Sequence, residues 1–219
     1  MALSLASLNL HCGVDRHGAP YSVKQAVAAL DTDVVVVQEN WRTGDRPGIA
    51  AAAAADCGYP YVAELDLVTG RSLTELRIVR RVVPDDRGAW GLAVLSRVPW
   101  RGCASVRIGA ASRDPVGSRL AQIVTFAGVR VVNAHLTHRL TRGPGQLRRL
   151  LAALGASAEP TVIAGDLNMC RPTVLLARPY RPAVRGRTWP AHRPVAQIDH
   201  VLLGPGVPEV TGVVGPAVG

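Results

Sequence analysis

One stretch decides how the chain is interpreted: Val162-Ile163-Ala164-Gly165-Asp166-Leu167-Asn168. Residues 161–164 are apolar with a β-branched start, which is typical of a short buried strand. If the chain stays extended beyond Gly165, alternation places the side chains of Asp166 and Asn168 on one face and turns Leu167 into the core. A carboxylate beside a carboxamide suits a reacting anionic group, because Asp accepts a proton or holds a cation and the Asn amide donates to an oxyanion. The same residues are ordinary turn formers, so the stretch alone leaves both interpretations open.

The length and composition predict one large domain over residues 1–219. The chain has 219 residues, 48% of them hydrophobic, which is enough for a substantial core. We recognise no export signal at the N-terminus and no apolar run as long as a membrane span, so the expected location is cytoplasmic. Four cysteines are scattered without paired spacing, and we expect reduced thiols rather than disulfides or a zinc site.

The charge permits an anionic partner without identifying one. A net charge of +9 and a pI near 10.4 would suit nucleic acid. Lys24 is the only lysine among 25 basic residues, however, and such an arginine skew is typical of GC-rich coding. An aromatic content of 4% argues against a base-stacking platform for single strands.

Periodicity predicts more strands than helices, which favours stacked sheets with outer helices over a doubly wound parallel sheet. The expected helices span residues 21–30, 47–57 and 146–154. The expected strands span residues 4–8, 33–37, 61–67, 73–83, 91–96, 119–126, 129–134, 161–164 and 197–203. Several of these strands end in polar side chains that could carry chemistry: Asn9, Gln38, Glu39, Asn133, His135, Asp166, Asn168 and Asp199.

Six motifs follow one another along nearly the whole chain. They are LNLHCG, DVVVVQE, GLAVLSRVP, VVNAHL, GDLN and a TWP…IDHVL stretch, which begin at residues 8, 33, 91, 131, 165 and 188. In this order they resemble the endonuclease/exonuclease/phosphatase superfamily. Each piece is a weak match, and the ordered set is a strong one. The resemblance implies an α/β (α+β) four-layer sandwich, with two mixed β-sheets packed face to face and helices outside.

The resemblance also implies a Mg²⁺-dependent phosphoester hydrolase, with Mn²⁺ as an alternative ion. Glu39 would be the principal metal ligand, with Asn9 beside it, since Mg²⁺ prefers few carboxylates plus water and phosphate.

The remaining roles fall to the later motifs. His135 would donate to a phosphate oxygen, Asp166 would orient or deprotonate the attacking water, and Asn168 would hold the phosphate. Asp199 would support the histidine or the metal, and Asn133 would bind substrate or support the site.

The C-terminal end departs from the family pattern. A Ser-Asp-His-x-Pro stretch is expected before the last strand, and the sequence stops at Gly219 where that stretch would begin. Asp199 and His200 do not replace it, because neighbours in a strand point to opposite faces. We therefore expect Asp199 in the site and His200 in a structural role, in a domain that is C-terminally truncated and lacks its last strand.

Three functions remain open from the sequence. The first is a phosphoester hydrolase, for which nucleic acid is one of the candidate substrates. The second is a catalytically impaired member that binds a phosphorylated ligand or nucleic acid without turnover. The third is an unrelated sandwich used for protein interaction, in which the polar strand ends are turns. The oligomeric state cannot be predicted from these patterns.

Overall fold

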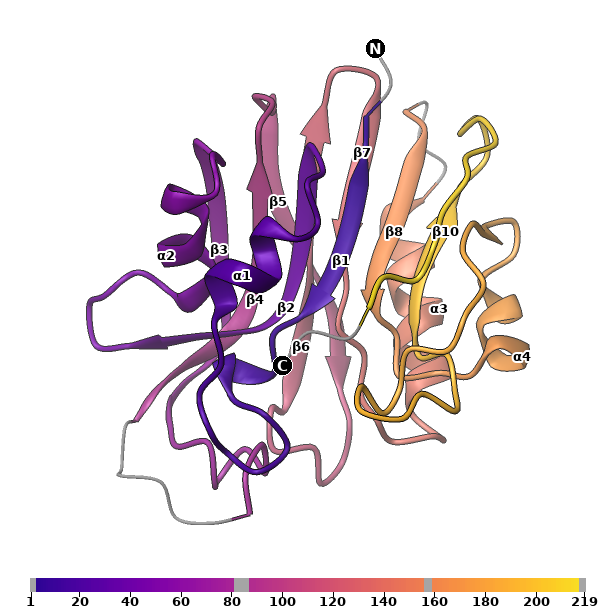
Figure 1. The fold of residues 1–219 in the computed structure, drawn as a ribbon. Helices are drawn as coiled ribbons and strands as arrows, with labels where there is room; N and C mark the ends of the chain where they lie inside the picture. Colours follow the sequence, from indigo (N-terminus) through magenta and orange to yellow (C-terminus); the bar gives the residue numbers. More distant parts are fainter. Residues whose placement is uncertain (1–2, 81–86, 156–158, 217–219) are drawn as a thin grey trace. The chain divides into compact units, whose positions relative to one another are not determined.

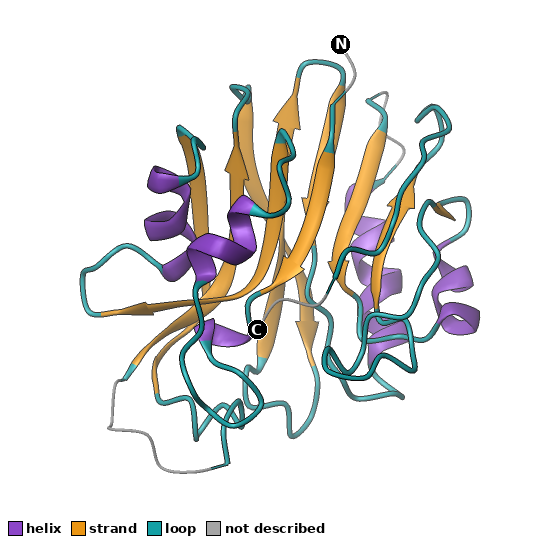
Figure 2. Ribbon diagram, in the orientation of Figure 1, coloured by secondary structure: helices purple, strands orange, loops and turns teal. Residues whose placement is uncertain are grey.

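The computed structural model describes residues 3–80, 87–155 and 159–216. Its strands form two sheets that belong to two compact units (Figures 1 and 2). The first unit comprises Met1–Pro99 and Pro115–Gly117, and the second comprises Trp100–Asp114 and Ser118–Val218.

The first unit contains a four-stranded mixed sheet in the order β1-β2-β4-β3. β1 and β2 are parallel, and the other pairs are antiparallel. The elements are β1 (Leu5–Asn9), a 3-10 turn η1 (His11–Gly13), α1 (Val23–Ala28), β2 (Val34–Thr43), α2 (Ile49–Asp56), β3 (Tyr61–Arg71) and β4 (Gly88–Ser96).

Burial explains why β2 is central in this sheet. Val35 and Val37 pack in a core with Val27 of α1 and with Ala50 and Ala54 of α2. The alternate residues of the strand are fully buried as well, so both faces of β2 are covered. An uninterrupted run of four valines, residues 34–37, suits a strand covered in this way, and the predicted strand over residues 33–37 is confirmed.

The second unit contains a six-stranded mixed sheet in the order β5-β6-β7-β8-β10-β9. Only β7 and β8 pair in parallel among its described strands. The elements are β5 (Gly102–Ala110), β6 (Ser118–Phe126), β7 (Val129–Asn133), α3 (Gly143–Leu154), β8 (Thr161–Asp166), α4 (Arg171–Val174), the 3-10 turn η2 (Leu175–Ala177), β9 (Arg181–Pro182) and β10 (Asp199–Leu203). Two mixed sheets with helices confirm the predicted fold class.

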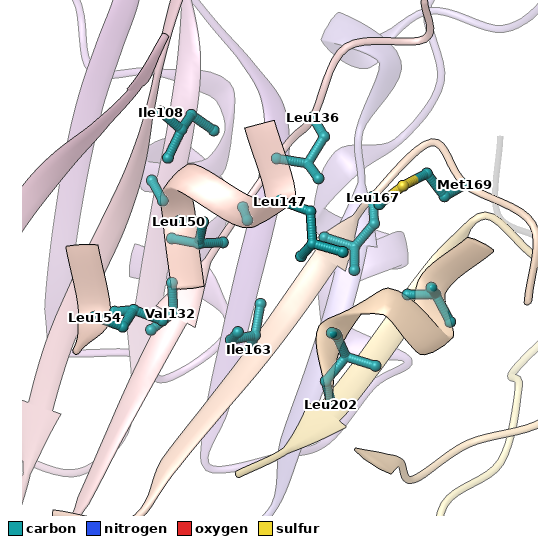
Figure 3. Packing of buried hydrophobic residues seen from close by; sticks show 14 of the residues in the cluster. Ile108, Val132, Leu136, Leu147, Leu150, Leu154, Ile163, Leu167, Met169 and Leu202 are labelled. Carbon is teal, nitrogen blue, oxygen red and sulfur yellow. The ribbon is translucent and has the colours of Figure 1, made fainter. Parts of the chain in front are cut away.

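One face of α3 packs on this sheet. Figure 3 shows Leu147, Leu150 and Leu154 of α3 in the cluster that also contains Val132 of β7 and Ile163 of β8. The leucines recur at helical spacing, as the sequence predicted, while the arginines between them are exposed. The packing fixes β7 and β8, the two strands whose ends carry most of the candidate site.

One predicted strand was wrong, and one strand of the structure was not predicted. Residues 73–80 form turns instead of a strand, and residues 81–83 of that prediction lie outside the described residues. Ser72 and Glu75 explain the turn, because each side chain accepts a hydrogen bond from the other's backbone N–H, as in a capping box. Strand β5 was not predicted, because its small and mostly exposed residues show no apolar alternation.

Candidate active site

The first set of candidate residues lies in the first unit, where β1 ends beside the interior of its parallel neighbour β2. Asn9 ends β1 opposite Gln38 of β2. The Asn9 Nδ2 donates to Oε1 of Glu39 at 3.2 Å, and its Oδ1 accepts from the backbone N–H of His11 at 2.9 Å. The carboxamide is therefore held in one orientation, with its amide nitrogen on the Glu39 carboxylate.

Glu39 lies in a β-bulge of β2. Gln38 pairs with Leu92 and Asn40 pairs with Gly91, so Glu39 is the extra residue inserted between these pairs. Its φ of 54° is in the left-handed region, which is uncommon for a residue with a long side chain. Bulges re-aim side chains and are frequent beside active sites. Because of the bulge, the Glu39 side chain does not follow the alternating up-and-down pattern of the other residues in β2.

The strand was predicted to end before this point, and it continues to Thr43. Asn40 has a structural task there. Its Oδ1 accepts from the N–H of Ala50 in the first turn of α2, and its Nδ2 donates to Glu64 on β3 at 2.5 Å. The residue after Glu39 thus ties the bulged strand to α2 and to β3, which lies beyond β4 in the sheet.

The charge of Glu39 acts on the buried Cys12 and on the partly buried Tyr21. Burial raises the pKa of the Cys12 thiol well above its usual value, and the Glu39 charge adds to that rise. Burial, then Cys12 and Glu39, raises the pKa of Tyr21 to about 12. Both groups therefore stay protonated at neutral pH. Glu39, 8% exposed, is the anionic oxygen donor of this set.

The donors of this set fit a hard divalent cation. A carboxylate and a carboxamide offer oxygen, which Mg²⁺ and Mn²⁺ prefer, and the protonated Cys12 thiol does not compete for a softer ion. Within residues 3–80, 87–155 and 159–216, no group of three or more His, Cys, Asp or Glu that could hold a metal is found.

The second set lies in the second unit, around the end of β8. The N–H of Asn168 donates to Oδ1 of Asp166 at 2.9 Å, and Asn168 Nδ2 donates to the Leu136 carbonyl at 2.9 Å. Asn168 has a φ of 50°, so the extended alternation predicted for Asp166 and Asn168 is wrong. The segment is a turn closed by the Asp166 carboxylate. Leu167 is fully buried, as predicted.

Gly165 lets β8 approach the segment that follows β7. The N–H of Ala134 donates to the carbonyl of Ala164, and the N–H of Leu136 donates to the carbonyl of Asp166, each at 3.0 Å. A Cβ on Gly165 would lie 2.0 Å from the Ala134 carbonyl oxygen, and its φ of +143° is one that L side chains rarely adopt. The glycine of GDLN is thus required by the close contact of two chain segments.

His135 lies in the middle of that bonded segment. Its Nε2 is 3.7 Å from Oδ2 of Asp166, and both side chains are buried. Desolvation, then the charges of Arg119 and His138, holds the pKa of His135 well below its usual value. The imidazole is therefore neutral at neutral pH and can donate through one nitrogen and accept through the other.

Asp199 joins Asp166 and His135 in this set. β10 is antiparallel to β8 with Asp199 opposite Asp166, so the two carboxylates share a face of the sheet. The Thr188 hydroxyl accepts from the N–H groups of Ile198 and Asp199 and so fixes the start of β10. Thr188 was not among the predicted site residues, because a threonine before a tryptophan carries no sequence signal for a hydrogen bond to a strand that begins eleven residues later.

His200 points to the face of the sheet opposite to Asp199, whereas Asn133, which pairs with Ala164 of β8, shares the face of Asp166. His200 is opposite Gly165, is 2% exposed, and bonds the Met169 carbonyl through Nε2 at 2.8 Å, which agrees with its predicted structural role. Asn133 is fully buried, and its Nδ2 donates to Gln122 of β6 at 3.5 Å.

Sequence reasoning also missed a buried ion pair beside His135. Arg119 of β6 and Asp114 are bonded to each other, and their side chains are 3% and 0% exposed. The sequence signal for this pair is weak, since Asp114 lies in the loop before β6, next to another arginine, and Arg119 follows it by five positions. Only the three-dimensional structure separates this arginine from the exposed ones.

The structure thus brings the candidate residues together in two sets. Asn9 and Glu39 contact each other in the first unit, and the second unit gathers His135, Asp166, Asn168 and Asp199 around the end of β8. Each set consists of oxygen donors, proton carriers and amide donors, which are the groups that handle an anionic substrate and a hard cation.

The sequence profile of the Endonuclease/Exonuclease/phosphatase family matches residues 6–219, so the chain belongs to that family. Members of the superfamily are phosphoester hydrolases, including nucleases, phosphatases and sphingomyelinases.

Solved structures show the same fold at low sequence identity. An endonuclease/exonuclease/phosphatase protein from Beutenbergia cavernae is 22% identical with a TM-score of 0.65, over 93% of this chain and 64% of that one. The chain therefore spans just under two thirds of that protein's length. A mannosyl-6-phosphatase from Bacteroides thetaiotaomicron is 13% identical with a TM-score of 0.60, over 94% and 86%. Sphingomyelinase C from Streptomyces griseocarneus is 20% identical with a TM-score of 0.58, over 93% and 84%.

Two searches, one of curated sequences and one of the helices of this structure, give negative results. No curated protein sequence matched this chain. Among the described residues, no helix has both the length and the apolar character needed to cross a membrane.

Proposed function

We propose that this chain is a divalent-metal-dependent phosphoester hydrolase in which water attacks phosphorus. The observation that carries the proposal is the buried set at the end of β8. There His135 lies 3.7 Å from Asp166, with Asp199 opposite Asp166 on the next strand. A neutral imidazole, two carboxylates and a carboxamide together offer the proton acceptor and the hydrogen-bond donors that hydrolysis of a phosphate ester needs.

Glu39, with Asn9 beside it, would hold Mg²⁺ or Mn²⁺. A cation bound there would supply positive charge to the phosphoryl group. Asn9 fixes the Glu39 carboxylate through its amide nitrogen, and the Asn9 oxygen, already bonded to His11, has a second lone pair for a ligand.

The residues of the second unit would act on phosphate and water. Asp166 has one carboxylate oxygen in the turn with Asn168 and the other directed to His135, so it orients or deprotonates the attacking water in a fixed position. His135 donates to a phosphate oxygen, and Asn168 binds the phosphate through its second amide hydrogen. Asp199 supports the histidine, and Asn133 acts by holding β7 to β6.

The charge distribution favours a polyanionic phosphodiester such as nucleic acid as substrate. The second unit contains 15 of the 25 basic residues and only 5 of the 16 acidic ones, while the first unit is close to neutral. A bias toward arginine codons would act on both units equally and does not explain this difference. Arg139 and Arg142 also follow His135 closely in the sequence, in the loop before α3.

The experiment measures hydrolysis of bis-p-nitrophenyl phosphate with Mg²⁺, with Mn²⁺ and in EDTA. We expect metal-dependent turnover that falls at least about 100-fold in Glu39→Gln and Asp166→Asn. The control Glu209→Gln changes an exposed carboxylate and retains full activity. Equal rates in EDTA contradict the proposal, and metal-independent binding of an oligonucleotide without turnover favours the impaired binding protein instead.

A second measurement addresses the substrate class. Cleavage of a DNA or RNA oligonucleotide is compared with that of the small ester at rising salt. For a nucleic-acid substrate we expect KM to rise steeply with salt concentration, because cation release contributes to binding of a polyanion. A KM that is insensitive to salt, or cleavage of small phosphomonoesters alone, contradicts the nucleic-acid assignment and leaves the hydrolase proposal standing.

A further inference from the structure

The buried pair Arg119–Asp114 adjoins the proposed reactive set without belonging to it. Arg119 Nε donates to Oδ2 of Asp114 at 3.1 Å, and Nη2 donates to Oδ1 at 3.4 Å. The remaining edge of the guanidinium donates through Nη1 to the His135 carbonyl at 3.0 Å. One side chain therefore connects a buried carboxylate to the backbone of the histidine.

The sheet shows why His135 needs this donor. The ladder between β6 and β7 ends at the pair Gln122–Asn133, two residues before His135. On the other side, the segment is bonded to β8 through the N–H groups of Ala134 and Leu136. Arg119 thus replaces the strand partner that β6 no longer provides, on the side of the segment opposite to β8.

Two side chains together hold consecutive carbonyl groups. Arg119 bonds the carbonyl of His135, and Asn168 bonds the carbonyl of Leu136. With both carbonyls fixed, the backbone of His135 has little freedom to rotate, and its imidazole keeps its position relative to Asp166. A backbone displacement of about 1 Å at a reacting group costs on the order of 100-fold in rate, so such a clamp has a large effect on catalysis.

The energetics of a buried ion pair support a positioning task over a purely stabilising one. Taking two charges out of water costs about as much as their attraction returns, and buried pairs are often replaced by apolar residues without loss of stability. Arg119 also has the planar, three-edged donor geometry that lysine lacks. Desolvation, then the charges of Arg119 and His138, lowers the pKa of His135. Arg119 thus helps to keep the imidazole neutral although its Nε2 faces the Asp166 carboxylate.

The geometry points to Arg119, anchored by Asp114, as a positioning residue that fixes the backbone of His135 for phosphoester hydrolysis. This inference rests on the proposed role of His135. It assigns to Arg119 no contact with substrate, because the guanidinium is 3% exposed and all its edges bond protein groups.

The test compares Arg119→Lys and Asp114→Asn with the control Arg130→Lys. Arg130 is a partly buried arginine of β7 that also bonds a side chain and a carbonyl, on Thr161 and Leu154, at the end of the strand away from His135. The rate of bis-p-nitrophenyl phosphate hydrolysis is measured for each variant. NMR then follows the His135 imidazole signals in the metal-free protein, and these signals are assigned as the ones missing from the spectrum of His135→Gln.

We expect kcat to fall on the order of 10- to 100-fold in Arg119→Lys, with KM changed less than about threefold. The His135 imidazole signals shift or broaden in Arg119→Lys and Asp114→Asn, and both kcat and these signals stay unchanged in Arg130→Lys. Unshifted His135 signals, or a loss of kcat no greater than that of Arg130→Lys, overturn the inference. If the wild type shows no hydrolysis, the proposed function fails, and the NMR comparison alone still decides whether Arg119 positions His135.

Discussion

Gly165→Ala tests the close approach on which the position of His135 depends. The new Cβ would lie 2.0 Å from the Ala134 carbonyl oxygen, whereas ordinary contacts at this position begin near 3.4 Å. The backbone would have to move by more than 1 Å, or the variant would lose the two hydrogen bonds that join β8 to residues 134–136. The φ of +143° adds strain that an alanine cannot relieve.

The expected cost follows from these two terms. The backbone conformation costs about 1–3 kcal/mol for a residue with a Cβ. Weakening the bonds of Ala134 and Leu136 costs about 1 kcal/mol each. We therefore expect the free energy of unfolding to fall by about 3–5 kcal/mol, and the hydrolysis rate of the protein that remains folded to fall as well, because His135 is displaced.

Urea denaturation followed by circular dichroism measures this change, with Gly128→Ala as the matched control. Gly128 also has a positive φ, +84°, and a Cβ there would meet nothing within 4 Å. The control therefore carries conformational strain of about 1 kcal/mol and no overlap. If Gly165→Ala is no less stable than Gly128→Ala, the contact does not constrain the segment and our explanation of the glycine is wrong.

Three further predictions concern protonation, cooperation between the two sets, and the strand that carries Glu39. Since burial holds the pKa of His135 below that of the unfolded chain, the unfolded state binds more protons between the two values, and stability falls as pH drops below about 6.5. His135→Gln should therefore lose less stability than the wild type between pH 7.5 and 5.5 in urea denaturation, and an equal loss would contradict a neutral buried imidazole. Glu39→Gln combined with Asp166→Asn should reduce kcat/KM by far less than the product of the single effects, because residues that act in one reaction are non-additive; strictly multiplicative losses would argue against one shared reaction. Asn40→Ala should lower the free energy of unfolding by about 1–2 kcal/mol, because the N–H of Ala50 loses its acceptor at the start of α2, and thermal denaturation that matches the wild type would refute that task.

The regular parts of the fold could be predicted from periodicity. The all-valine run located a strand buried on both faces, and the spaced leucines of α3 located its packed side. The strands predicted over residues 119–126 and 129–134 are present as β6 and β7, which pair antiparallel. These patterns succeed because burial on a repeating face leaves a repeating signal in the sequence.

The failures fall where local hydrogen bonds or exposure override the apolar pattern. Residues 73–80 alternate like a strand, but Ser72 and Glu75 close a turn there. Strand β5 is mostly exposed at the edge of its sheet, so it needs no apolar residues. Neither case could be decided from hydrophobicity alone, since the deciding bonds join a side chain to the backbone or a strand to its neighbour.

The candidate residues show a different relation between pattern and structure. The pattern of polar strand ends predicted Asn9, Glu39, His135 and Asp166. In the structure Asn9 bonds Glu39, and His135 lies 3.7 Å from Asp166. The sequence could not show that Glu39 occupies a bulge, because a bulge is a property of pairing between strands. Nor could it separate Arg119 from other arginines, since only its burial and its bond to the His135 carbonyl distinguish it.

The two interpretations of the GDLN stretch prove to be compatible. Asp166 closes a turn with Asn168, as ordinary turn formers do, and the same turn leaves its second oxygen toward His135. Glu39 and Asn168 are both residues with a side chain in the left-handed region, where strain persists only if the surroundings enforce it. In the first set a bulge directs the Glu39 side chain, and in the second the turn after β8 holds the Asp166 carboxylate. Candidate residues in related sequences are therefore best sought where a buried strand stops alternating, and a strand that continues undisturbed through such residues would argue against a site.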